Sequence, residues 1–222
     1  MHAEGMQKKF DPACLPARPE LSFEQNLWVQ GVRAIAGLDE AGRGAWAGPV
    51  FAAAVIFPPS LVLTPALSVI NDSKKLTPAQ REHCAAIIKG AALDWCVGSA
   101  TVAEIDLQGI LPASRLAMSR AIQGLKIQPE YLLVDYVSLP EIHLPQLPLI
   151  KGDARSLSIA AASILAKTAR DAEMVRLAAQ YDGYGFERHK GYGTAFHQGK
   201  LIELGVSDIH RTSFRPIKLQ LK

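Results

Sequence analysis

The stretch from Gly44 to Asn71 carries no charged side chain, and it limits the folds open to this chain more than any other part of the sequence. An uncharged run of this length could cross a lipid bilayer as a helix. Prolines inside a helix remove backbone hydrogen bonds, however, and this run contains Pro49, Pro58, Pro59 and Pro65. The piece between them at residues 50–57 has the length of a buried strand. The sequence therefore predicts a protein that does not insert into a membrane.

Apolar runs typical of strands and segments typical of helices follow one another along the chain. The predicted strands cover residues 34–38, 50–57, 93–100, 131–134 and 149–150. The predicted helices cover residues 77–90, 113–125 and 157–180, and the first opens with Thr77 and Pro78. Late in the longest helix, Lys167, Arg170, Asp171 and Arg176 indicate a solvent-facing side. Strands that first succeed one another and then alternate with helices predict an α/β fold, a mixed central β-sheet flanked by helices.

No repeat or linker divides the chain, so we expect one main domain over residues 31–222, preceded by an N-terminal tail or extension at residues 1–30. The first twenty residues are polar and lack the apolar core of a secretory signal. Disulfide frameworks and zinc sites need more cysteines at closer spacing than Cys14, Cys84 and Cys96. These features favour a cytoplasmic protein with free thiols.

The charge is divided unevenly along the sequence, although the net value of +3 is small. Residues 1–150 carry 12 basic and 14 acidic side chains, whereas residues 151–222 carry 12 basic and 7 acidic ones. A basic C-terminal third beside an acidic cluster would suit a polyanion held against metal ions.

Acidic side chains follow three of the predicted strands directly or after a short turn: Asp39, Glu40, Asp135 and Asp153. Side chains at the carboxyl ends of strands open onto the rim of a sheet. If these strands are neighbours, the acids converge and need cations to offset their repulsion, and hard oxygen ligands favour Mg²⁺ or Mn²⁺ over zinc. An acid after a strand is also a common turn former or helix N-cap, and for each acid alone that alternative stays open.

Longer motifs run in order between residues 34 and 216: GLDEAGRGAWAGPV, NDSKKL, EID, LLVDY, KGDARSLSIAAASILAKTARD, HKGYGTAFH and IHRTSF. In these motifs the chain resembles the type 2 ribonucleases H, most closely bacterial ribonuclease HII. The resemblance implies a ribonuclease H-like fold with a small helical C-terminal part. It also implies an endonuclease that hydrolyses the RNA strand of RNA/DNA hybrids and cuts 5′ of single ribonucleotides in duplex DNA. The implied products carry 3′-hydroxyl and 5′-phosphate ends.

The resemblance also assigns roles to individual positions. The family's catalytic, metal-binding acids fall on Asp39, Glu40, Asp135 and Asp153, which are then expected to hold two Mg²⁺ or Mn²⁺ ions. As a hypothesis, Asp39 and Asp135 share both ions, while Glu40 and Asp153 complete one ion each. The elements of the family that contact the substrate fall on Gly42, Arg43, Gly44 and Tyr192. A departure follows the third acid, where most relatives carry glycine and this chain has Tyr136.

These substrate-contacting residues suit the detection of a ribose 2′-hydroxyl, which both donates and accepts hydrogen bonds. Gly42 and Gly44 let backbone groups approach the sugar, and Arg43 offers a forked contact to phosphate. Tyr192 can place its ring or its hydroxyl at the same sugar. An ordinary turn between two strands is the alternative interpretation of the two glycines.

Further substrate contacts are predicted on two loops. One contains Asn71, Ser73 and Lys74, where phosphate could lie near amide groups and an ammonium, although the segment also reads as a simple turn. The other spans residues 183–197 and mixes aromatic, glycine and basic residues, with phosphate contacts expected at Arg188, His189, Lys190 and His197. Its alternative is a surface loop packed on its own tyrosines.

Three residues keep alternatives that the sequence does not separate. Asp171 lies four residues after Lys167, so a surface ion pair is the default and a supporting role beside the metals is the alternative. His210 and Arg211 either contact phosphate or tie the C-terminal segment to the body of the protein.

The expected partners are RNA/DNA hybrid and ribonucleotide-containing duplex DNA, bound by a cytoplasmic monomer, and a replication clamp is left open. Another nuclease on a related fold is the second interpretation, since a fold does not fix a function. The Gly-Arg-Gly element and Tyr192 disfavour it, because a DNA-cutting enzyme needs no 2′-hydroxyl sensor. A non-catalytic nucleic-acid binding protein is the third, and the four acids disfavour it because their charge hinders phosphate binding.

Overall fold

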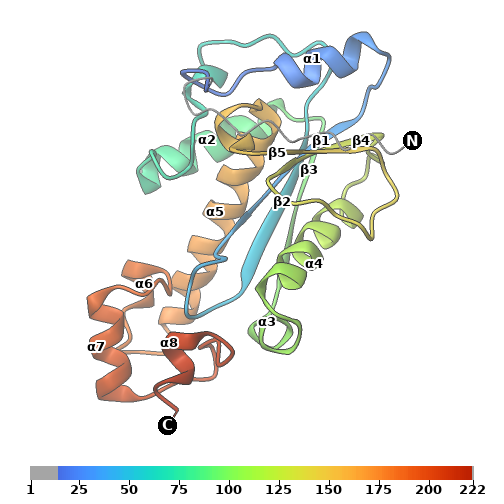
Figure 1. Cartoon of the computed structure of the whole chain (residues 1–222). Helices are drawn as coiled ribbons and strands as arrows, with labels where there is room; N and C mark the ends of the chain where they lie inside the picture. Colours follow the sequence, from blue (N-terminus) through green and yellow to red (C-terminus); the bar gives the residue numbers. More distant parts are fainter. Residues whose placement is uncertain (1–14, 222) are drawn as a thin grey trace.

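The computed structural model describes residues 15–221 and centres on a five-stranded sheet in the order β3-β2-β1-β4-β5 (Figure 1). Its strands are β1 (Ile35–Ala41), β2 (Val50–Ile56), β3 (Asp94–Ala100), β4 (Tyr131–Asp135) and β5 (Gln146–Leu149). Its helices are α1 (Ser22–Val29), η2 (Leu67–Val69), α2 (Pro78–Ala91), α3 (Val102–Gln108), α4 (Ile110–Gln123), η3 (Gly152–Ala154), α5 (Leu157–Ala178), α6 (Phe186–His189), α7 (Ala195–Leu204) and α8 (Arg215–Lys218).

The sheet is mixed, as the sequence predicts. β1 pairs antiparallel with β2, and β2 pairs antiparallel with β3. β1 pairs parallel with β4, and β4 pairs parallel with β5. Because parallel strands end at the same edge of a sheet, the carboxyl ends of β1 and β4 lie side by side.

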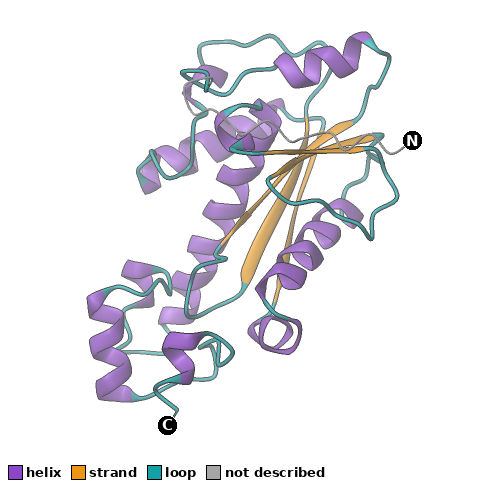
Figure 2. Cartoon of the chain, in the orientation of Figure 1, coloured by secondary structure: helices purple, strands orange, loops and turns teal. Residues whose placement is uncertain are grey.

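Helices cover both faces of the sheet (Figure 2). Successive side chains of a strand point to opposite faces, and along β2 Ala52 and Ala54 pack with α4 whereas Ala53 and Val55 pack with α2 and α5. The approach of α5 to β1 is so close that a Cβ atom at Gly37 would lie 2.2 Å from the backbone carbon of Ser158. Only glycine fits there, so α5 is pressed against the strand that carries the first two acids.

The helix boundaries follow local capping. Thr77 is the N-cap of α2, with the reciprocal hydrogen bonds of a capping box to Gln80 and with Pro78 at the first position, which confirms the predicted start. The predicted helix at residues 157–180 is observed as α5. Helix α3 was not predicted, although the sequence carries a signal for its start, because Thr101 and Glu104 form a second capping box.

The last strand lies earlier than expected. We predicted residues 149–150, whereas β5 spans Gln146–Leu149 and includes Pro148. Proline cannot donate a hydrogen bond within a sheet and is tolerated in edge strands. β5 is the edge strand of this sheet, so a proline that argued against a strand is compatible with one here.

Part of the expected N-terminal extension is ordered against the domain. Residues 1–14, including Cys14 and nearly half of the predicted tail, lie outside the described residues. Beyond them, Glu20 forms a parallel β-bridge with Ser156, and α1 places Glu24 in a buried position. Contacts between α1 and the start of α5 therefore link the two sides of the expected boundary near residue 31.

The C-terminal helices α6, α7 and α8 gather at the far end of α5, as the expected small helical part (Figure 1). Their contacts with α5 include a cluster in which Met174 and Leu177 meet Tyr184 and Phe186. The prediction that Arg170 faces solvent is wrong, because its side chain is fully buried where α5 meets this C-terminal part. Within residues 15–221, no helix is long and apolar enough to cross a membrane.

Candidate active site

The four acids predicted from the strand ends are brought together at one edge of the sheet. Asp39 and Glu40 stand near the end of β1, and Asp135 ends β4. Leu38 pairs with Val134 across the parallel strands, so Asp39 and Asp135 are the next positions along two neighbouring strands. Asp153 reaches them from η3, where the backbone N–H of Gly152 donates to Oδ1 of Asp135 at 2.7 Å.

Asp39 and Asp153 are buried, Glu40 and Asp135 are half-buried, and the four acids repel one another. Burial raises the pKa of Asp39 well above its usual range, and the charges of Glu40, Asp135 and Asp153 add to this rise while a hydrogen bond from Ser163 opposes it. Burial also raises the pKa of Glu40, against the attraction of Arg43, whose Nη1 lies 3.2 Å from Oε1. The pKa of Asp135 is raised by burial and by Asp153. A site of this kind favours a cation, which would offset the repulsion.

The donor chemistry fits hard divalent cations. Oε2 of Glu40 is buried without a hydrogen-bond partner, so one carboxylate oxygen is left for a ligand. Oxygen ligands of this kind suit Mg²⁺ or Mn²⁺. Within residues 15–221, no three histidine, cysteine or acidic side chains have the arrangement of a ready-made metal site. The fit therefore rests on the charge, burial and oxygen donors of the four acids.

Replacing Asp39 with asparagine should stabilise the chelator-treated protein near neutral pH. A carboxyl group whose pKa is raised by folding destabilises the folded state once it ionises, by about 1.4 kcal/mol for every tenfold change in its acid dissociation constant. The stabilisation should be largest above the raised pKa and should vanish as the pH falls to about 3, where the carboxyl group is protonated in both states. Thermal unfolding of the unchanged chain and of Asp39→Asn across this pH range measures the stabilisation. The substitution Asp182→Asn at an exposed position is the control. Lower stability of Asp39→Asn at neutral pH would contradict the assignment.

Tyr136, in place of the glycine usual after the third acid, keeps a glycine-like backbone. Its φ angle is 60°, in the left-handed region that non-glycine residues seldom adopt. Its N–H donates to the carbonyl of Leu149 at 2.9 Å, which fixes the chain directly after Asp135. Tyrosine in place of glycine therefore adds an exposed side chain, while the backbone keeps a conformation that suits glycine.

The loop that carries Gly42, Arg43 and Gly44 is hydrogen-bonded to the loop that carries Tyr192. The N–H of Trp46 donates to the carbonyl of Gly191 at 2.8 Å, directly beside Tyr192. Gly42 has a φ angle of 98°, and a Cβ atom there would lie 2.0 Å from Nε of Arg170, so glycine is required. A Cβ atom at Gly44 would meet nothing within 4 Å, so its backbone is open to a ligand. The structure thus brings together the two elements predicted to contact the sugar.

Two buried arginines that the sequence analysis did not assign to this site join these loops. Arg170 on α5 donates to the carbonyls of Pro49, Ala47 and Lys190 at 3.0, 3.1 and 3.0 Å. Arg211 donates to the carbonyls of Gly48 and Arg43 at 2.9 and 3.0 Å. For Arg211 this favours the alternative in which it ties the C-terminal segment to the body of the protein. In the sequence, Arg170 is marked by the motif KGDARSLSIAAASILAKTARD and Arg211 by the motif IHRTSF.

The segment with Asn71, Ser73 and Lys74 lies beside the acids. Nζ of Lys74 is 3.7 Å from Oδ2 of Asp153, and although burial opposes it, the attraction of Asp153 and Asp39 raises the pKa of Lys74. Ser73 is buried, and its Oγ lies 3.0 Å from Oγ of Ser163, the residue that hydrogen-bonds Asp39. Oδ1 of Asn71 accepts from the N–H of Asp72 within its own turn.

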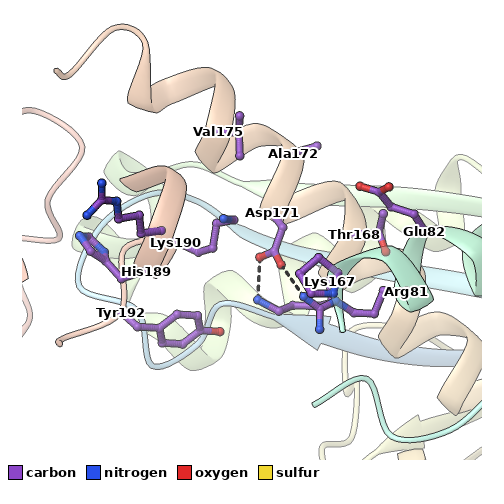
Figure 3. Close-up of a pocket in the computed structure, with 12 residues that line it drawn as sticks. Arg81, Glu82, Lys167, Thr168, Asp171, Ala172, Val175, His189, Lys190 and Tyr192 are labelled. Carbon is purple, nitrogen blue, oxygen red and sulfur yellow. Dashed lines mark hydrogen bonds and ion pairs between the residues drawn. The ribbon is translucent and has the colours of Figure 1, made fainter. Parts of the chain in front are cut away.

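A pocket of about 600 Å³ opens beside Tyr192, between α2, α5 and the loop after α6 (Figure 3). Asp171 lies in it and pairs with Lys167 at 2.6 Å and Arg81 at 3.2 Å, which confirms the expected ion pair and adds a second cation. The rim also carries Arg188 and Lys190. Cations outnumber acids around this pocket, so it favours an anionic ligand.

The two histidines that were predicted to contact phosphate instead form hydrogen bonds within the protein. His189 lies at the pocket, but its Nδ1 accepts from the N–H of Gly191 and its Nε2 bonds the carbonyl of Tyr184. His197 is fully buried, where its ring bonds the carbonyl of Tyr192 and Nε2 of His210. Burial lowers the pKa of His197 to about 4, so it is neutral at pH 7. Both rings therefore support the tyrosine loop from inside.

Comparisons with known proteins identify one family of similar proteins. Residues 36–217 match the family model of ribonuclease HII. The chain is 49% identical over 200 residues to ribonuclease HII of Dehalococcoides mccartyi strain 195, covering 90% of this chain and 94% of that protein. It is 52% identical over 194 residues to ribonuclease HII of Moorella thermoacetica, covering 87% of this chain and 92% of the relative.

Solved structures agree with these sequence matches. The ribonuclease H2 of Pyrococcus horikoshii superimposes with a TM-score of 0.70 at 25% identity, covering 84% of this chain and 96% of that one. The ribonuclease HII of Archaeoglobus fulgidus, solved in complex with PCNA, gives a TM-score of 0.67 at 25% identity and covers 85% of this chain and 97% of its own. The ribonuclease H-like fold expected from the sequence is confirmed.

Proposed function

This chain belongs to the ribonuclease HII family and is a type 2 ribonuclease H that acts on RNA/DNA hybrids, and from that premise we propose that it also cuts 5′ of single ribonucleotides in duplex DNA. The proposed products carry 3′-hydroxyl and 5′-phosphate ends, as in the excision of misincorporated ribonucleotides. The observation that carries the proposal is the position of the four acids, two buried and two half-buried, at the edge of the sheet near the hydrogen bond that joins the loop holding Gly42 to the loop holding Tyr192.

The acids are proposed as the ligands of two divalent cations, Mg²⁺ or Mn²⁺. Asp39 and Asp135, on adjacent parallel strands, would hold the ions together with Glu40 and Asp153. Two bound divalent cations would supply an activated water and offset charge on the attacking and leaving oxygens. The raised pKa values of Asp39, Glu40 and Asp135 and the unpartnered Oε2 of Glu40 support this assignment.

Recognition of the ribonucleotide is proposed to lie in the two joined loops. The backbone at Gly42 and Gly44 can approach a ribose 2′-hydroxyl without an intervening side chain, and Arg43 can bind the neighbouring phosphate. Tyr192 would lie against the sugar, its ring held by Arg170, whose Cζ is 5.3 Å from the ring centroid. A 2′-hydroxyl is what distinguishes RNA from DNA at one position.

Contacts to the substrate backbone are proposed for the neighbouring cations. Lys74 lies beside Asp153, where a phosphate next to the cut would pass, with Asn71 and Ser73 shaping the turn that holds it. Arg188 and Lys190 stand at the rim of the pocket beside Tyr192. Because both ring nitrogens of His189 are engaged within the protein, we propose that only its backbone faces the substrate.

We further propose action as a cytoplasmic monomer, with a replication clamp as a partner. The clamp proposal draws on the Archaeoglobus fulgidus ribonuclease HII, which was solved as a complex with PCNA. Copurification of the full chain with a clamp from the same source would support it, and a lack of binding at micromolar concentrations would contradict it.

Cleavage of three matched duplexes tests the proposed function. They are a DNA duplex with one ribonucleotide, the same duplex in DNA alone, and an RNA/DNA hybrid, each with Mg²⁺, Mn²⁺ or chelator. We expect metal-dependent cutting of the first and third, with the single cut 5′ of the ribonucleotide and a 5′-phosphate on the product. Cutting of the hybrid alone would contradict single-ribonucleotide recognition by Gly42, Gly44 and Tyr192.

A further inference from the structure

Glu24 on α1 is a buried carboxylate that lies outside the segment matched by the family model, residues 36–217. It has 0% exposure, and no ion pair with it occurs among residues 15–221. A buried charge is costly unless it is paired or hydrogen-bonded, so its contacts have to account for its position.

All of the hydrogen bonds of the Glu24 side chain within the described residues go to the start of α5. Its Oε1 accepts from Oγ of Ser156 at 2.6 Å, from Oγ of Ser158 at 2.6 Å and from the N–H of Ser158 at 3.0 Å. The partial positive charge of a helix N-terminus also stabilises a carboxylate at this point. These contacts join residues that are more than 130 positions apart in the sequence.

The same N-terminal segment supplies a second bond to α5. The first N–H of the helix, at Leu157, donates to the carbonyl of Glu20 at 2.8 Å, and the N–H of Glu20 donates to the carbonyl of Arg155 at 3.1 Å. The N–H of Ile159 donates to Oγ of Ser156. The free N–H groups in the first turn of α5 are thus satisfied by Ser156 itself and by residues 20–24.

The turn that carries Asp153 lies between this junction and Asp135. The N–H of Ser156 donates to the carbonyl of Gly152 at 2.9 Å, so the residue held by Glu24 closes the turn from one side. The N–H of Gly152 donates to Oδ1 of Asp135, which closes it from the other. Asp153 is therefore placed by a chain of hydrogen bonds that begins at Glu24 and ends at another acid of the site.

We propose that Glu24 is a positioning residue of the active site, which fixes the start of α5 and thereby holds Asp153 beside Asp135 for metal binding. This inference rests on the proposed role of the four acids. It extends the catalytic unit to an N-terminal segment that the family model does not cover. The oxygen acceptor of Glu24, rather than its charge alone, is what the geometry uses.

Two substitutions at Glu24 in the full chain test this role against a merely structural one. Glu24→Ala removes the acceptor and Glu24→Gln retains it, while Gln25→Ala alters an exposed neighbour on the same helix as control. Binding of Mn²⁺ to the DNA-free protein is measured by titration calorimetry at a temperature where circular dichroism shows every variant folded. The kcat and KM for hybrid cleavage are measured alongside.

We expect Glu24→Ala to bind Mn²⁺ about 10-fold to 100-fold more weakly. Its kcat should fall similarly while KM for the duplex stays unchanged, and Glu24→Gln should recover most of both losses. Unchanged Mn²⁺ affinity and kcat in Glu24→Ala would overturn the inference, even if its melting temperature falls. Equal losses in Glu24→Gln and Glu24→Ala would overturn the part assigned to the oxygen acceptor. If the unsubstituted chain binds Mn²⁺ but cuts no ribonucleotide substrate, the proposed function fails, and the Mn²⁺ titration still decides the role of Glu24.

Discussion

Replacing Asp135 with asparagine should lower kcat for RNA-strand cleavage by about 10³-fold or more, because a charge proposed to hold the cations is lost. Asparagine keeps the size of the side chain and an oxygen that can accept from the N–H of Gly152, so the fold should be preserved. Binding of the duplex should be unchanged or tighter, since one of the mutually repelling acids is removed. Single-turnover cleavage and fluorescence anisotropy measure the two effects separately.

Asp182→Asn is the matched control for this substitution. Asp182 is exposed on the loop after α5, and its Oδ1 accepts only from the N–H of Gly183 among the hydrogen bonds of the described residues, a contact that asparagine keeps. Its kcat should equal that of the unchanged chain. Cleavage by Asp135→Asn within tenfold of the unchanged chain would exclude Asp135 as a metal ligand.

Replacing Arg170 with methionine should lower the free energy of unfolding by about 3 kcal/mol or more, because buried carbonyls without donors each cost about 1–3 kcal/mol. The substitution leaves the carbonyls of Pro49, Ala47 and Lys190 without this donor. It also removes one of the links between the loop holding Gly42 and the loop holding Tyr192, while the backbone bond from Trp46 to Gly191 stays. Denaturant unfolding measures the stability, and the ratio of cleavage with one ribonucleotide to cleavage of hybrid measures recognition, which should fall.

Arg176→Met provides the control on the same helix. The Arg176 side chain is 57% exposed and pairs with Glu173 within the same helical face, so its loss should leave the stability almost unchanged. If Arg170→Met and Arg176→Met were equally stable and equally selective for ribonucleotides, the joining role of Arg170 would be wrong.

The position of the acids could be predicted from the sequence because the signal is local. Each acid stands at or after an apolar run, whereas the sequence left open whether the strands that carry them are neighbours, which the parallel pairing of β1 with β4 answers. The long motifs added the identity of the two loops that are proposed to contact the sugar. The bond between Trp46 and Gly191 that joins these loops has no local signal, since it depends on how α5 places the C-terminal part.

Other parts of the site could not be predicted because they depend on distant packing. The sequence pattern predicts that Arg170 faces solvent on an amphipathic helix, but the C-terminal part of the fold covers its side chain. His189 and His197 were predicted to contact phosphate because they lie among glycines and basic residues. Both rings instead form hydrogen bonds with backbone carbonyls of the protein. Glu24 gives no signal at all, since its partners lie at the start of α5.

Titration of Mn²⁺ into the chain bound to an uncleavable hybrid tests the central claim most directly. If Asp39, Glu40, Asp135 and Asp153 hold the catalytic cations, the unchanged chain should bind two Mn²⁺ ions per molecule, and Asp135→Asn should lose this binding while Asp182→Asn retains it. Equal Mn²⁺ stoichiometry and affinity in Asp135→Asn and the unchanged chain would contradict the claim that these carboxylates form the metal site.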